Sequence, residues 1–177
     1  MKNSGLAGPR RSALGATAKN LRTYLNDHLA ASVTAIKLLS RLQSLNGQED
    51  LPRFAGEMRL EIEQDQGELK KLMQRLRITK SRTRMATAWF AHQLTDLKMR
   101  FDDPRDHRLR RLEMLELVEV GLEGKRALWQ ALSAASHAAP ELRGPDYHQL
   151  TNRAQNQHDR IETARLVSAR NAFANHR

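Results

Sequence analysis

An acidic residue stands where a charge would be costly, on the apolar face of a segment in the first half of the chain. Asp65 falls between Ile62 and Leu69, at the three- and four-residue spacing of one face of an α-helix. A buried carboxylate without a partner costs several kcal/mol, so the sequence predicts that Asp65 has one. The candidate partners, each near an apolar face, are His28, Lys125, Arg126, His158 and Arg165.

Three interpretations of Asp65 are open at this stage. The first, which we favour, is a structural polar layer that fixes how the helices align, because buried polar groups serve that purpose in helical bundles. The second is part of an altered metal site. The third is that the apolar face is drawn wrongly and that Asp65 faces solvent.

Basic side chains gather in two clusters, within a chain whose formal net charge is +10. The first cluster runs from residue 70 to residue 84 without an acidic residue, and it is a candidate for binding nucleic acid or another polyanion. The alternative is an ordinary solvated surface, since cations also complement the carboxyl end of a helix. The first cluster consists of Lys70, Lys71, Arg75, Arg77, Lys80, Arg82 and Arg84, and the second of Arg105, Arg108, Arg110 and Arg111.

Two glycines one helical turn apart interrupt a segment whose other residues strongly favour a helix. Gly121 and Gly124 each cost roughly 1 kcal/mol relative to alanine, so we expect a neighbour to approach closely there. A bulky side chain such as Phe54 or Trp89 would pack over this notch. The functional alternative is a small-ligand pocket beside Trp129.

Most catalytic chemistry finds no support in the sequence. The chain has no cysteine, which excludes disulfides, thiolate metal sites and cysteine nucleophiles. Its seven histidines are scattered singly, and neither a Gly-x-Ser-x-Gly motif nor a phosphate-binding glycine-rich loop is present. An enzyme is therefore the less favoured interpretation, and we expect no cofactor.

The elements that must position these residues are helices throughout. Apolar residues recur at helical spacing, and Asn46-Gly47, Pro104, Pro140 and Gly144-Pro145 separate the amphipathic segments. We expect a flexible basic tail over 1–18 and a single helical domain over 19–177. The predicted helices span about 20–45, 53–77, 84–100, 105–137 and 146–174.

The lengths of the connections predict the topology. Two connections are short, as antiparallel neighbours require, whereas the segment 78–107 is long enough to travel the length of a bundle. The second and third core helices should therefore run in the same direction. This layout, a four-helix bundle with a long helical crossover, resembles the ferritin-like superfamily. The alternatives are an up-down bundle with an extra outer helix, or a helical dimer that shares its core.

The resemblance implies a metal site that this sequence matches only in part. Ferritin-like di-metal proteins use inward glutamates and two Glu-x-x-His pairs. Here Glu61-x-x-Gln64 lacks the histidine, and Gln155-x-x-His158 lacks the carboxylate. A divergent site for iron, manganese or zinc would use Glu61, Asp65, Glu119 and His158.

The leading functional interpretation is a non-enzymatic interaction or scaffolding protein. No run of about 18 apolar residues suggests a membrane span, and the lack of cysteine gives no support for an oxidising compartment, so we expect a soluble, cytoplasmic protein. Helical bundles often associate through leftover apolar faces, and the predicted helix Met85–Phe101 is our candidate for a homo-oligomer interface. A divergent metal-binding or redox protein and a nonspecific polyanion-binding protein are the alternatives.

Overall fold

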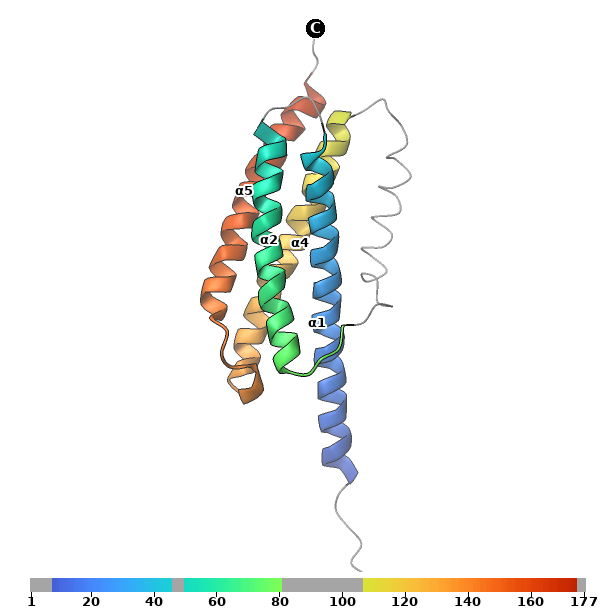
Figure 1. The fold of residues 1–177 in the computed structure, drawn as a ribbon, viewed down its shortest axis with the longest axis vertical. Helices are drawn as coiled ribbons and strands as arrows, with labels where there is room; N and C mark the ends of the chain where they lie inside the picture. The colour runs from blue at the N-terminus through green and yellow to red at the C-terminus, as the bar shows by residue number, and fades with distance from the viewer. Residues whose placement is uncertain (1–7, 46–49, 81–106, 175–177) are drawn as a thin grey trace, which may run out of the picture.

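The structure is an all-α four-helix bundle, as the sequence predicts (Figure 1). It is a computed structural model that describes residues 8–45, 50–80 and 107–174. The long helices pack against one another along their length, and one short 3-10 helix turns the chain between the last two. The helices are α1 (Gly8–Gln43), α2 (Asp50–Arg75), α4 (His107–Ser136) and α5 (Tyr147–Phe173), and the 3-10 helix is η1 (Pro140–Leu142).

The observed boundaries of α2, α4 and α5 lie within a few residues of the predicted ones, but α1 begins much earlier than expected. The sequence predicts a flexible tail over 1–18. In the structure the helix starts at Gly8, and its first turns project beyond the other helices (Figure 1). Alanine, leucine and arginine are strong helix formers, and in this segment they outweigh Gly15. The predicted helix 84–100 and its proposed interface lie outside the described residues.

The directions of the helices agree with the topology inferred from the connection lengths. In Figure 1, α2 and α4 run the same way, and α1 and α5 run the opposite way. The core agrees, because buried residues of α2 between 51 and 62 share one hydrophobic cluster with residues 114–122 of α4. Further along both helices, residues 69–73 and 128–132 share the other cluster. The kinship with ferritin-like proteins stays a prediction, since a shared layout does not establish a shared family.

Polar side chains lie between the two hydrophobic clusters. The first cluster contains Leu39, Met58 and Leu115, and the second is built around Trp129. Asp65 is only 3% exposed and Gln157 is completely buried. The core is therefore interrupted at its middle by groups that require hydrogen-bond partners.

A tight corner sets the direction of α5 after α4. Gly144 has a φ of 122°, which an L side chain rarely adopts, and a Cβ added there would lie 2.5 Å from Nη1 of Arg75. The Asp146 carboxylate caps α5 by accepting a hydrogen bond of 2.9 Å from a backbone N–H in its first turn. The Tyr147 hydroxyl donates to the Leu142 carbonyl at 2.5 Å. These contacts start α5 at a defined angle to α4.

The outer faces of the bundle are mostly polar. Large apolar side chains that reach solvent are spread over several helices, with Leu60 on α2 and Phe173 at the end of α5 the most exposed. Among the described residues, none of the helices has an apolar stretch long enough to cross a lipid bilayer.

The core predicts a sharp contrast between two positions of α4. We expect Leu115→Ala to lower the free energy of unfolding by about 2–5 kcal/mol, because Leu115 is fully buried in the first cluster. Val120→Ala on the same helix should change it by less than about 0.5 kcal/mol, since Val120 is 43% exposed. Urea denaturation of both variants measures the difference, and equal losses would contradict this packing.

Candidate functional site

Asp65 is buried at the centre of the bundle and lies between two cations from two other helices. Its Oδ2 atom is 2.5 Å from the Lys125 ammonium on α4, and its Oδ1 atom pairs with the Arg153 guanidinium on α5. The prediction that Asp65 needs a basic partner is confirmed. Lys125 was among the candidates, whereas Arg153 was not. Arg126, another candidate, pairs with the exposed Glu123 on its own helix instead.

The same network extends towards a second carboxylate on α2. The Lys125 ammonium also donates to the Gln157 side-chain oxygen, and the Gln157 amide donates to Oε2 of Glu61 at 3.2 Å. Arg160 donates to Oε1 of Glu61 at 2.6 Å. We call this network the central charge layer. Its members are Glu61, Asp65, Lys125, Arg153, Gln157 and Arg160.

Burial lowers the pKa of the Lys125 ammonium, and the neighbouring Asp65 carboxylate opposes that shift. The Arg153 guanidinium also disfavours the charge on Lys125, because the two cations flank the same carboxylate. Such a network helps folding only when its hydrogen bonds are satisfied, and removing one partner is expensive. The central charge layer therefore ties α2 to both α4 and α5.

The four residues proposed as a metal site do not meet in one place. Glu61 and Asp65 already face the cations of the central charge layer. Glu119 instead pairs with Arg165, Oε2 to Nε at 2.5 Å, and its other oxygen is 3.8 Å from Nε2 of His158. A metal ion at Glu61 or Asp65 would have to displace basic side chains.

One compact group of metal-ligand types does occur on the surface of α5. Ligand atoms of His158, Asp159 and Glu162 lie within 4.8 Å of one another. The Asp159 and Glu162 side chains are exposed, and the Asp159 carboxylate also accepts a hydrogen bond from Gln155 at 2.7 Å. The group contains one of the four predicted ligands, and exposed acidic groups of this kind are common without a metal.

A small cavity adjoins the central charge layer between α1, α2 and α4. Its volume is about 30 Å³, and one wall is the backbone of Gly121. Within the described part of the chain, no atom of another element comes within 4 Å of a Cβ added at Gly121 or Gly124. The polar side chains that line the cavity are His28, Ser32, Asp65, Gln66 and Lys125, and Trp129 completes its apolar wall.

The expectation that Phe54 packs over the glycine notch is therefore wrong. Phe54 lies elsewhere, with its ring 5.8 Å from the Arg160 guanidinium carbon. Trp89, the other candidate, lies outside the described residues. The glycine spacing correctly marked an unusual place, but that place is open instead of filled.

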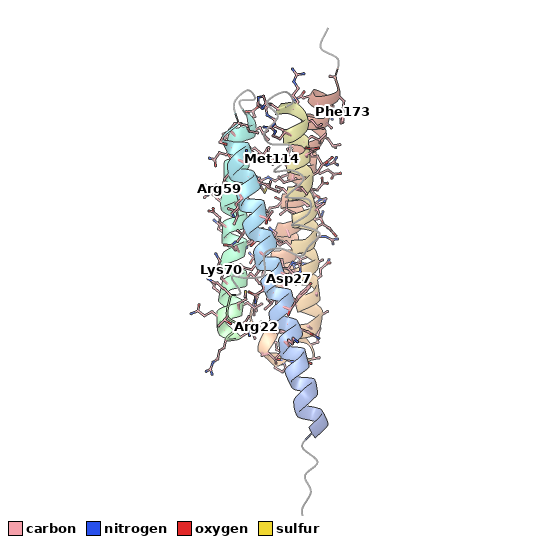
Figure 2. All side chains as sticks on the ribbon, turned by 90° about the vertical axis from the view of Figure 1, so that its right-hand side faces the viewer. Arg22, Asp27, Arg59, Lys70, Met114 and Phe173 are labelled. Carbon is pink, nitrogen blue, oxygen red and sulfur yellow. The ribbon has the colours of Figure 1, made fainter. Side chains whose placement is uncertain are left out.

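The first basic cluster lies at the end of the bundle where α2 finishes. Arg22 of α1 joins it, because its guanidinium donates to the Thr79 hydroxyl at 3.0 Å. In Figure 2, Arg22 and Lys70 lie on the lower half of the bundle, away from Met114 and Phe173 near the other end. We call this surface the basic end. Its described members are Arg22, Lys70, Lys71, Arg75, Arg77 and Lys80, whereas Arg82 and Arg84 lie outside the described residues.

The second basic cluster is at the opposite end of the bundle, as the parallel course of α2 and α4 predicted. Arg108, Arg110 and Arg111 belong to the first turns of α4. Arg105 lies outside the described residues. The two clusters therefore do not form one continuous surface.

Comparison with protein-family models, with curated protein sequences and with solved structures found no match to this chain. The function must therefore be inferred from the sites themselves. The central charge layer is internally paired and is buried at Asp65 and Gln157, which suits a structural role. The basic end is mostly exposed and carries cations from both α1 and α2.

The central charge layer predicts a large effect for the loss of one buried cation. We expect Lys125→Met to lower the free energy of unfolding by about 3–5 kcal/mol, because Asp65 would keep only Arg153, whose side chain is 35% exposed. Lys71→Met is the matched control, since Lys71 makes an exposed pair with Glu68 and should matter by less than about 0.5 kcal/mol. Similar values for the two variants would show that the layer contributes little.

The His28 ring predicts how stability depends on pH. Burial lowers the pKa of His28 below its usual 6.5, against the opposing effect of Asp27. As the pH falls below 6.5, the unfolded chain takes up the proton before the folded protein does. Between pH 6.5 and the lower pKa of the folded protein, His28 therefore lowers the free energy of unfolding. Thermal unfolding of wild type and His28→Gln between about pH 5 and pH 8 should show a weaker loss in the variant. Parallel curves would contradict a lowered pKa of His28 in the folded protein.

Proposed function

We propose that this protein is a non-enzymatic interaction module that binds a polyanion, such as a nucleic acid backbone, at the basic end of the bundle. The observation that carries the proposal is the conformation of Arg77. This residue has a φ of 54°, the left-handed region in which glycine is favoured. An exposed arginine therefore occupies a position at which glycine would stabilise the fold better.

The hydrogen bonds around Arg77 explain why the chain adopts this conformation. The Ile78 N–H donates to the Met73 carbonyl at 2.8 Å, and the Arg77 N–H donates to the Gln74 carbonyl at 3.0 Å. This pair of bonds is the Schellman motif, in which the residue held in the left-handed conformation is usually glycine. Left-handed backbone costs an L residue about 1–2 kcal/mol. Residues held in such strained backbone conformations cluster at binding and catalytic sites, which favours a binding role for Arg77.

The charges of the basic end support the same proposal. In the described part of the chain, no carboxylate lies within 4.0 Å of the charged groups of Arg75, Arg77 or Lys80, and all three side chains are exposed. Lys71, in contrast, pairs with Glu68 at 2.9 Å. Cations without internal partners are available to bind phosphate groups and to release their counterions.

The segment that carries these cations is held in place by α1. The Thr79 hydroxyl accepts a hydrogen bond from Arg22, and its carbonyl accepts one from the Asn26 amide at 3.3 Å. Asn26 is buried and also donates to the Arg22 carbonyl at 2.8 Å. The basic end therefore combines side chains from α1 and from the end of α2 on a fixed backbone, which lowers the entropy lost on binding.

A substitution at Arg77 separates binding from stability. We expect Arg77→Gly to raise the free energy of unfolding by about 1 kcal/mol, because glycine adopts this backbone without strain. The same change should weaken binding to a fluorescently labelled DNA or RNA oligonucleotide, and the slope of log K against log salt should become shallower by roughly one unit. Fluorescence anisotropy at several salt concentrations measures both quantities.

The matched control for this experiment is Arg53→Gln, which removes one exposed positive charge from the other end of α2. Its oligonucleotide affinity should stay close to that of wild type. Wild-type binding that is absent, or that does not depend on salt, would overturn the proposed function. Equal losses in the two variants would show attraction by net charge alone, without a role for the basic end.

A further inference from the structure

One side chain that lines the cavity carries a buried hydrogen-bond donor without an acceptor among the described residues. Trp129 is 1% exposed and lines the cavity, and its indole N–H has no hydrogen-bond partner among the described residues. Buried polar groups in folded proteins almost always have a partner, from the protein or from an ordered small molecule. The indole nitrogen can only donate, so the missing partner must be an acceptor.

Lys125 also lines the cavity and has a donor that its two hydrogen bonds leave over. Its ammonium has three N–H groups, and two of them are directed to the Asp65 carboxylate and the Gln157 oxygen. The Asp65 carboxylate lies between two cations, Lys125 and Arg153, so its charge is more than balanced. The surroundings therefore tolerate a group with lone pairs, or a negative charge.

Two other polar side chains that line the cavity, Ser32 and Gln66, already bond to one another. The Gln66 amide donates to the Ser32 hydroxyl at 2.9 Å, and that hydroxyl donates to the Leu29 carbonyl at 2.7 Å. The Gln66 oxygen accepts from the Lys70 ammonium. These groups complete a polar wall on the α1 and α2 side, opposite the Gly121 backbone on α4.

The size of the cavity restricts what it can hold. A water molecule needs about 10–15 Å³ of such space, and the cavity offers about 30 Å³. There is room for one or two water-sized particles, and none for a metabolite or an organic cofactor. Gly121 lines the cavity and a Cβ built there meets no other atom within 4 Å, so a side chain at this position would extend into open space beside the cavity.

We propose that the cavity beside Gly121 binds a small hydrogen-bond acceptor, a water molecule or a halide ion, which completes the hydrogen bonds of Trp129 and Lys125. The ligand joins the indole on α4 to the central charge layer. It also explains why a glycine, which weakens the helix, stands at this position of α4. The inference does not depend on polyanion binding at the basic end.

A crystal structure of the full chain, grown in chloride and again in bromide, tests the site directly. We expect electron density in the cavity within hydrogen-bond distance of the Trp129 N–H. An anomalous peak in bromide identifies a halide, and density without that peak identifies water. An empty cavity at a resolution where other buried waters are visible would overturn the proposal.

Two alanine variants test the site in solution. Gly121→Ala and Gly124→Ala both replace an unobstructed helical glycine one turn apart, but only Gly121 lines the cavity. We expect Gly124→Ala to raise the Tm and Gly121→Ala to raise it less, because the methyl group displaces the bound ligand. A Tm for Gly121→Ala as high as that of Gly124→Ala, or higher, would mean that the cavity is dry. Removing the indole N–H with Trp129→Phe should abolish the difference between the two alanine variants.

Discussion

The pairing of Asp65 with Lys125 and Arg153 is the interaction on which the arrangement of the bundle depends. The backbones of α2 and α5 come close to each other at few positions. Polar side chains nevertheless connect these two helices at both Glu61 and Asp65. A buried carboxylate has a low energy only where its cations can reach it. Sliding α2 by one turn would separate Asp65 from both partners. In one direction it would bring the apolar Leu69 to Lys125 and Arg153, and in the other it would take Glu61 away from Arg160. The charge layer thus selects one alignment of the helices, which apolar packing alone would leave less defined.

The central charge layer lies between the two hydrophobic clusters of the core. On its two sides, the hydrophobic clusters supply most of the stability by removing apolar side chains from water. The basic end lies beyond the second cluster, where Arg77 keeps a backbone conformation that glycine would adopt with less strain. A rigid core can compensate for such a local cost, so the exposed cations are held in a fixed arrangement.

Periodicity found the position of Asp65 because a charge on an apolar helical face stands out in the sequence. Lys125 could be proposed as its partner for the same reason. Arg153 could not be predicted as a partner of Asp65 from the apolar spacing, because a long side chain can reach a buried carboxylate from the edge of the apolar face. The glycine notch of α4 marked an unusual place, but a helix by itself does not reveal whether its neighbours fill a gap. The early start of α1 was missed because single glycines were weighted above the helix-forming residues around them.

The central claim is that Asp65 and Lys125 stabilise the fold as a pair. A double-mutant cycle tests it most directly, with Asp65→Ala, Lys125→Met and the combined variant measured by urea denaturation under identical conditions. The account predicts that the double variant loses less stability than the sum of the single variants, with a coupling energy above about 1 kcal/mol. Additive losses would contradict the account, because they would mean that the two residues act independently.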